Sequence, residues 1–307
     1  MKRIITVGEC SLDIIFSAEG QPLGSMPGGR IVNAAAILAR EGLPVVMASD
    51  AAADPVGDIV VRFLSEAGVD VSCVDRYTDG RTPIQIFTAG EDAAGHILPT
   101  AIRYENYPDE AFDIVWPRYD EGDIIIFGGF YAIDPKTNAN INQFLRMAKD
   151  RKAILVYVPG FLPERTHAVT RLMPSILENL ELADIVVARN ADLEVVFGTS
   201  GQPGTCYRDH VNFYCRSLVN VDAMCHHITY FSGTETTGAE IPDSVATTLM
   251  WNAGIVAGIA KAIIAADLKA DDLDTPGVEI REKIITSAIQ TAAAAARNLK
   301  EDWQKTH

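Results

Sequence analysis

The chain has 307 residues, of which 48% are hydrophobic and 22% are charged, and its formal net charge is −15. A chain of this length and composition buries a large hydrophobic core, and its composition is not that of a disordered protein. The negative charge argues against nucleic acid or an anionic membrane as a partner, because both are bound by basic surfaces. The sequence therefore predicts a small-molecule partner, with no nucleic acid and no membrane.

The N-terminus leads from Met1, Lys2 and Arg3 directly into the apolar run "IITVGE", which is too short for a signal peptide. The five cysteines are widely spaced and include no C-x-x-C pair, so they indicate neither a disulfide framework nor a standard zinc site. From these features we predict a cytoplasmic protein.

Short runs rich in β-branched residues alternate with helical patterns in the first 80 residues. Strands are predicted over "RIITVG", "PVVMAS" and "VDVSCV", and helices over 31–41 and 55–67. Asp54 followed by Pro55 is the pattern of an N-cap and a first helical residue. This β-α-β rhythm predicts a parallel sheet covered by helices on both faces.

Residues 81–102 alternate apolar and polar positions around a turn-rich centre, which predicts a β-hairpin. The run "CSLDIIFS" is a second candidate strand outside the main sheet. We predict that residues of about 10–26 and 80–104 form a small β lid. Its apolar residues Ile84, Ile86 and Phe87 indicate either a homodimer surface or a cap over the ligand.

The β-α rhythm resumes after residue 122. The runs "GDIIIFGG", "AILVYVPG" and "ADIVVARN" predict buried strands, separated by helices over 137–150 and 164–180. Farther along, 209–219 is predicted as a helix, "HHITYFSG" as a strand and "TETTGAE" as a loop. The prediction is a single α/β domain over 1–307, with its ligand beyond the carboxyl ends of the parallel strands.

The segment "PGGRIVNAAAILAREG" is the strongest local signal for a binding site. Gly28 and Gly29 precede a helix whose first turn carries Asn33, so backbone N–H groups and an amide face the sheet edge. Asp13 lies in the candidate strand "CSLDIIFS", and a carboxylate and an amide can share hydrogen bonds with neighbouring sugar hydroxyls. A plain tight turn and a solvated acid are the alternative interpretations.

The chain resembles the ribokinase/PfkB carbohydrate kinase family. The resemblance covers most of residues 1–198 and rests on the order of several motifs, among them "GE", "LD", "GGRIVNAA", "GDIIIFGG" and "ADIVVARNADLEVVFG". It implies a ribokinase-like doubly wound parallel sheet sandwiched by helices, with a small β lid. It also implies ATP and Mg²⁺ as cofactors if the protein is active, and a sugar or nucleoside held by Asp13, Gly28, Gly29, Asn33 and Thr82.

The second signature of that family is D-T-x-G-A-G-D, followed by a helix that contains N-A-G. Its glycines form an anion hole, and its last Asp takes the proton from the sugar hydroxyl. Alignment on "WNAG" places Asp243 at the first Asp, Ala246, Thr247 and Thr248 in the anion-binding turn, and Leu249 at the base. Leucine accepts no proton, and loss of a positioned base typically costs about 10² to 10⁴ in rate.

Two functions follow from this departure. One is a kinase with a relocated base, for which Asp243 is a better candidate than Glu240 or Asp92. The other is a non-catalytic relative that binds a sugar-like ligand or a partner subunit. A dinucleotide-dependent enzyme is disfavoured because no G-x-G-x-x-G follows the first strand. Asp192 or Glu194 in "RNADLE" is the remnant of the family's metal-organising acidic element.

Overall fold

A nine-stranded sheet forms the centre of the computed structural model, in the order β13-β12-β11-β10-β9-β8-β1-β4-β5. Neighbouring strands from β11 to β5 are parallel, whereas β12 is antiparallel to both β11 and β13. The strands are β1 (Ile4–Val7), β4 (Val45–Ala52), β5 (Asp70–Tyr77), β8 (Ile124–Gly128), β9 (Ile154–Val158), β10 (Ile185–Arg189), β11 (Ser217–Asp222), β12 (His227–Ser232) and β13 (Glu235–Glu240). The structure describes residues 2–17, 19–91, 97–106, 114–160, 169–198, 202–222, 226–246 and 251–306.

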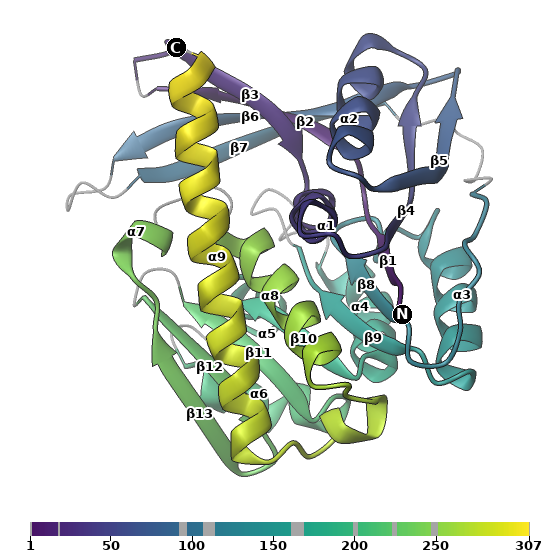
Figure 1. Ribbon diagram of the computed structural model, residues 1–307, viewed down its shortest axis with the longest axis vertical. Helices are drawn as coiled ribbons and strands as arrows, with labels where there is room; N and C mark the ends of the chain where they lie inside the picture. The colour runs from purple at the N-terminus through teal and green to yellow at the C-terminus, as the bar shows by residue number, and fades with distance from the viewer. Residues whose placement is uncertain are drawn as a thin grey trace.

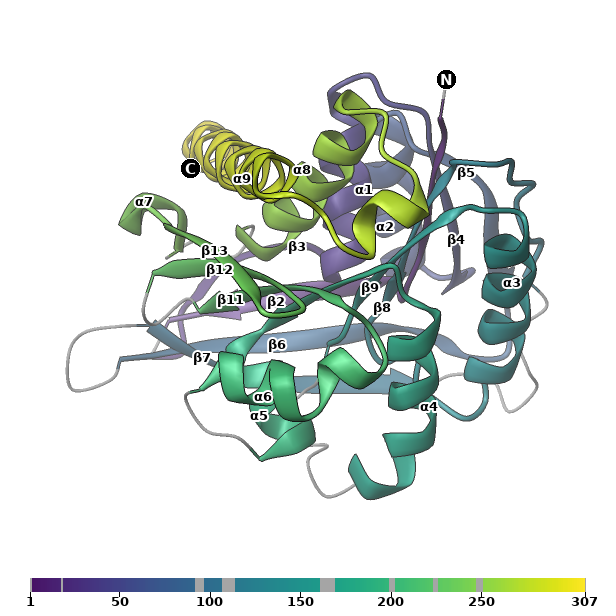
Figure 2. The ribbon, with the colours of Figure 1, turned by 90° about the horizontal axis from the view of Figure 1, so that it is seen from below.

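Helices cover both faces of this sheet, as Figure 2 shows. One face carries α1 (Arg30–Arg40), α2 (Pro55–Glu66), α8 (Trp251–Ala265) and α9 (Val278–Thr306). The other face carries α3 (Asn138–Asp150), α4 (Val169–Leu182), α5 (Asn190–Phe197) and α6 (Pro203–Asp209). Short 3-10 turns span Val211–Phe213 and Ala270–Leu273, and α7 spans Asp243–Ala246.

Consecutive residues of the central strands pack into the two opposite cores. In β8, Ile124 and Ile126 contact the α1 and α8 side, whereas Ile125 and Phe127 contact the α3 side. Strands buried on both faces are continuous apolar runs, which explains "DIIIFGG" and "AILVYV". The predicted doubly wound α/β fold is confirmed.

Two predictions for the region after residue 202 are wrong. Residues 209–219, predicted as a helix, contain the end of α6, a 3-10 turn and the start of β11. Short apolar runs such as "SLVNV" fit a buried strand and a helix equally well by periodicity. The predicted loop "TETTGAE" contains β13, an edge strand paired with all of β12. Its side chains are mostly exposed and polar, so the sequence lacks an apolar alternation there.

A second sheet of four strands lies across the carboxyl ends of the central strands (Figure 1). We call it the lid sheet, and its order is β3-β2-β6-β7. As the alternation predicts, β6 and β7 form an antiparallel hairpin. The strand β2 begins four residues after β1 ends, which holds the lid sheet close to the edge of the central sheet. The strands are β2 (Ser11–Phe16), β3 (Pro22–Gly28), β6 (Arg81–Glu91) and β7 (Ile97–Asn106).

Asp54 joins the lid sheet to α2. Its Oδ1 accepts hydrogen bonds from the Gly57 amide, at 2.8 Å, and from the Thr82 hydroxyl, at 2.9 Å, while its Oδ2 accepts from the Thr82 amide at 3.0 Å. The Thr82 hydroxyl also accepts from the amide of Ala52. The predicted N-cap is therefore present, and it also fixes the start of β6.

We expect Asp54→Ala to lower the free energy of unfolding by about 1–3 kcal/mol, because it removes a helix cap and leaves buried donors of Thr82 unpaired. Urea unfolding measures the change. Asp58→Ala is the matched control, since Asp58 lies in the first turn of the same helix and is exposed with a surface ion pair to Arg76; it should cost less than about 1 kcal/mol. Equal losses in the two variants would contradict the role of Asp54 in joining α2 to the lid sheet.

Four of the five cysteines lie in the described part of the chain, and all four are buried free thiols. Burial raises the pKa of Cys10 and of Cys215 to about 12, so both remain protonated at neutral pH. No helix in the described ranges is long and apolar enough to cross a membrane.

Candidate functional site

The turn between β3 and α1 brings the carboxylate of Asp13 onto the backbone of Gly28. A Cβ on Gly28 would lie 1.9 Å from Asp13 Oδ1 and 2.4 Å from the hydroxyl of Ser11, so any side chain there would displace the Asp13 carboxylate. Gly29 follows with φ +96° and precedes the first residue of α1. The two glycines therefore have different tasks, one for close approach and one for a left-handed backbone.

Asp13 comes from β2 in the lid sheet. It is paired in register with Met26 of β3 and Gln85 of β6, and the Ser11 hydroxyl lies 3.4 Å from its Oδ1. Gln85 is buried although polar. The lid sheet thus contributes a carboxylate, a hydroxyl and an amide to the region above the turn.

Asn33 is buried in the first turn of α1 with an exposed fraction of 6%. Its Nδ2 donates to the carbonyl oxygens of Pro27 and Gly29, each at 3.1 Å. Two carbonyl acceptors fix the orientation of the amide, because a flipped amide would place its oxygen against them. The Oδ1 is left without a hydrogen-bond partner among the described residues.

The structure therefore gathers Asp13, Gly28, Gly29 and Asn33 around one turn. Thr82, the fifth residue assigned to the ligand by resemblance, is 3% exposed and has its hydroxyl between Asp54 and Ala52. That hydroxyl positions the lid hairpin.

A cluster of three charged side chains lies where β10 ends. The carboxylate of Asp192 receives hydrogen bonds from Arg189 Nε, at 2.9 Å, and from Arg30 Nη1, at 3.0 Å. Arg30 Nη1 also donates to the carbonyl oxygen of Pro159 at 2.7 Å. We call Arg30, Asp192 and Arg189 the ion cluster. It connects the start of α1, the end of β9 and the start of α5.

The charges of the ion cluster stabilise one another. Burial alone would raise the pKa of Asp192, but the guanidinium groups of Arg189 and Arg30 hold it well below its usual range. Burial and the charge of Arg189 lower the pKa of Arg30, and the carboxylates of Asp192 and Glu9 oppose this shift. The side chain of Asp192 is completely buried.

The residues present do not fit a divalent cation at this place. Both carboxylate oxygens of Asp192 accept hydrogen bonds from arginine, so a cation would have to displace a guanidinium group. Glu194, the other residue predicted for this role, is exposed two residues farther along α5. Among the residues that the structure describes, no three His, Cys, Asp or Glu side chains form a group able to hold a metal ion.

The region of the predicted anion hole begins at α7. Since β13 runs in the same direction as β11, Asp243 follows it at the carboxyl edge of the sheet. Asp243 is 87% exposed in its side chain, and its Oδ1 lies 2.6 Å from Nδ1 of His226. Ala246 ends α7. The predictions for Thr247, Thr248, Leu249 and Asp92 concern residues outside the described ranges.

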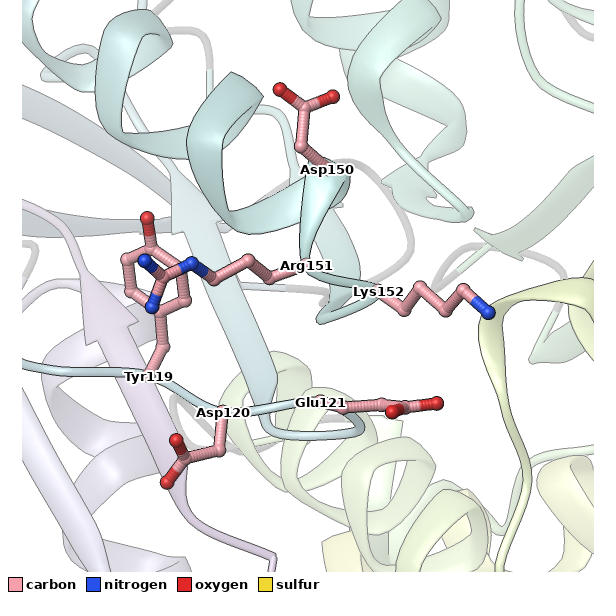
Figure 3. Close-up of a pocket in the computed structure, with 6 residues that line it drawn as sticks. All are labelled: Tyr119, Asp120, Glu121, Asp150, Arg151 and Lys152. Atoms are coloured by element: carbon pink, nitrogen blue, oxygen red, sulfur yellow. The ribbon is translucent and has the colours of Figure 1, made fainter.

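Hollows at the opposite, amino-terminal edge of the sheet show no comparable arrangement. One of about 340 Å³ is lined by the loops before β8 and β9. In Figure 3, Arg151 lies over the ring of Tyr119, while Asp150 and Lys152 point away from it. Another, of about 240 Å³, lies between the starts of β10 and β11. Neither hollow is lined by a residue that the sequence assigns to the ligand.

The doubly wound sheet, the lid sheet and the turn at Gly28 define a ribokinase-like α/β fold. Solved structures share it. Apo fructokinase from Vibrio cholerae O395 superposes with a TM-score of 0.77 and 15% identity, covering 97% of this chain and 99% of that chain. Aminoimidazole riboside kinase from Salmonella enterica, complexed with aminoimidazole riboside and an ATP analogue, superposes with a TM-score of 0.76 and 14% identity. The match covers 96% of this chain and 93% of that chain.

A model of the pfkB family carbohydrate kinases matches residues 1–211, and the chain belongs to that family. A curated Pyrococcus horikoshii protein, whose name gives it provisionally as a sugar kinase, is 23% identical over 195 residues. That match spans 62% of each chain. The family match ends before Asp243, the residue at which the second signature would begin.

Proposed function

We propose that the protein binds a sugar-like small molecule, a sugar or a nucleoside, between the turn at Gly28 and the lid sheet. The buried Oδ1 of Asn33 carries this proposal, because an unpaired buried acceptor costs about 1–3 kcal/mol and a ligand hydroxyl would satisfy it. Asp13 lies over the same turn and supplies a second acceptor group. Two acceptors of this kind suit the hydroxyl groups of a carbohydrate.

Access of the ligand requires movement of the lid sheet. The Oδ1 of Asn33 is covered by protein atoms in this structure. Pro27, whose carbonyl oxygen orients the Asn33 amide, belongs to β3, and Asp13 belongs to β2. A shift of these two strands would open the site and change both groups together, which is the behaviour of a lid. A homodimer formed through the lid sheet stays a prediction from the sequence.

The proposed function does not include the phosphotransfer that is usual in the family. The base position is Leu249, and no Asp or Glu occurs between Asp243 and Asp267. Both carboxylate oxygens of Asp192 accept hydrogen bonds from the arginines of the ion cluster, so neither is available to Mg²⁺. Binding without turnover is the function that these three observations support together.

An ATP-dependent kinase is the second candidate. It is favoured by the pairing of Asp243 with His226, since an aspartate that holds Nδ1 of a histidine orients the ring as a general base. Among solved structures, a fructokinase from Xylella fastidiosa with bound ATP shares the fold, with a TM-score of 0.72 and 18% identity. If ATP is used, the sugar hydroxyl would lose its proton to His226 or Asp243.

We expect a panel of sugars and nucleosides to contain a ligand that binds the wild-type chain in calorimetry. Asp13→Asn should weaken the affinity for that ligand by about ten- to a hundredfold, because hydrogen bonds to a charged acceptor are stronger than those to a neutral one. Asp120→Asn is the matched control, since Asp120 is 84% exposed at the opposite edge of the sheet. Unchanged affinity in Asp13→Asn would contradict the assignment of the site.

The same titrations with ATP and Mg²⁺ separate the two candidates. Formation of a phosphorylated ligand would overturn the non-catalytic proposal and establish the kinase. In that case, loss of turnover in His226→Gln or Asp243→Asn, with ligand affinity retained, identifies the relocated base. Ligand binding without turnover supports the proposed function.

A further inference from the structure

The hollow of about 240 Å³ between the starts of β10 and β11 lies at the edge of the sheet opposite the proposed ligand site. We call it the amino-edge hollow. Its walls come from the ends of α3 and α4, from residues 212–216 before β11, and from Asp274 after the second 3-10 turn. Drug-sized ligands occupy clefts of roughly 300–1,000 Å³, so this hollow suits a smaller molecule.

The groups at the ends of α3 and α4 are occupied by contacts within the protein. Lys149 Nζ donates to the carbonyl oxygen of Leu182 at 2.6 Å and lies 3.5 Å from Asp184 Oδ1. The other oxygen of Asp184 accepts from the amide of Leu155 at 2.8 Å. This pair therefore holds the end of α4 to the start of β9.

The segment 212–216 has a fixed backbone. The hydroxyl of Tyr207 lies 2.6 Å from the carbonyl oxygen of Arg216 and 3.0 Å from Asn212 Oδ1. The amide of Cys215 donates to the carbonyl oxygen of Val211 at 2.9 Å. The side chain of Arg216 therefore starts from a rigid point on the wall of the hollow.

Three charged groups of the amino-edge hollow make no hydrogen bond within the described part of the chain: the guanidinium of Arg216 and the carboxylates of Glu181 and Asp274. Arg216 Nη1 lies 3.6 Å from Asp274 Oδ2, which is too far for a hydrogen bond. Their side chains are 57% and 62% exposed, and Glu181 is also exposed. The hollow thus offers open groups of both signs to a ligand.

We propose that the amino-edge hollow binds a free α-amino acid with an apolar side chain. An anion alone would meet the carboxylates of Glu181 and Asp274, and a cation alone would meet Arg216, whereas a zwitterion has a partner for each. An α-amino acid carries both charges on one carbon atom, which matches the short separation of Arg216 and Asp274. This site goes beyond the proposed function and does not depend on it.

Arg216 binds the carboxylate of such a ligand, because the forked donors of a guanidinium match two carboxylate oxygens. Asp274 accepts from the ammonium group. The apolar side chain lies against Phe213 and Tyr214, which also line the hollow and are 77% and 40% exposed. Removing part of these rings from water favours an apolar side chain over the hydrogen atom of glycine.

The first test compares whole amino acids with their halves by saturation-transfer NMR and calorimetry on the full chain. L-Leucine is the zwitterionic probe, 3-methylbutylamine lacks its carboxylate, and 4-methylpentanoate lacks its ammonium. We expect L-leucine to bind about tenfold or more tightly than either half, because each half loses a charged hydrogen-bonding group. Absence of L-leucine binding would overturn the proposal, as would equal binding of either half.

The second test assigns the binding to the amino-edge hollow. Arg216→Gln and Asp274→Asn should each weaken L-leucine by about tenfold or more. Arg151→Gln is the matched control, since Arg151 lines the other hollow with its guanidinium over the ring of Tyr119. Circular dichroism checks that each variant is folded. Affinities in Arg216→Gln equal to those in the control would overturn the assignment.

Asp13→Asn separates this site from the proposed ligand site. We expect it to leave the affinity for L-leucine unchanged, and we expect Arg216→Gln to leave sugar or nucleoside binding unchanged. Loss of L-leucine binding in Asp13→Asn would place the amino acid in the strand-end crevice and overturn the proposal. Failure of every sugar and nucleoside to bind would overturn the proposed function and leave the amino-acid site standing.

Discussion

Asp192→Ala is expected to lower the free energy of unfolding by about 3–5 kcal/mol, the range found when one partner of a buried ion pair is removed. The variant leaves the half-buried side chains of Arg30 and Arg189 without the buried carboxylate to which both now donate. It also releases the contact between the start of α1 and the start of α5. Urea unfolding of wild type and variant at pH 7 measures the loss.

The pH dependence of stability provides an independent check. Because the folded-state pKa of Asp192 is depressed, its contribution is fully present above the ordinary aspartate value of about 3.9 and is lost as the pH falls below it. The difference between wild type and Asp192→Ala should therefore shrink on acidification. Asp120→Ala, which removes an exposed ion pair with Arg3, should cost less than about 1 kcal/mol. Similar losses in the two variants would show that the cluster is not a buried unit.

The first 198 residues carry most of what the sequence reveals about the fold. Runs such as Ile124–Gly128 are apolar without interruption, and only burial on both faces requires that pattern. Asp54 and Pro55 mark the start of α2 by local chemistry alone. The region of β11 to β13 was harder to predict, because β13 owes its position to backbone pairing with β12 and its side chains give no sign of it.

The candidate site, too, was predicted only in part from the sequence. Asp13, Gly28 and Asn33 were predicted from family motifs, and the structure gathers them around one turn. The ion cluster was missed, since Arg30 and Asp192 meet only through the tertiary fold. A signal was nevertheless present: an arginine directly after a glycine turn, and another at the end of a buried strand, both occupy edges where ligands bind.

The glycine of "WNAG", which in the sequence supports kinase ancestry, has a packing role in the structure. The helix α8 lies between α1 and α9, as Figures 1 and 2 show. A Cβ on Gly254 would lie 2.4 Å from the Cα of Ala292, and a Cβ on Gly258, one turn later, 2.4 Å from the carbonyl oxygen of Ser287. Two glycines on one face let the backbones of α8 and α9 touch, and the Ser287 hydroxyl donates to the carbonyl of Gly258 at 2.7 Å.

Gly258→Val is accordingly expected to destabilise the protein by about 3 kcal/mol or more, because its side chain meets backbone atoms that cannot rotate away. The direction of this change is informative, because replacing a glycine inside a helix would otherwise raise the free energy of unfolding. Gly204→Val in α6 is the matched control: a Cβ there would make an ordinary contact of 3.5 Å with Phe231, so we expect a change below about 1 kcal/mol. Urea unfolding compares the two. A neutral Gly258→Val would mean that α9 can move away from α8 at little cost.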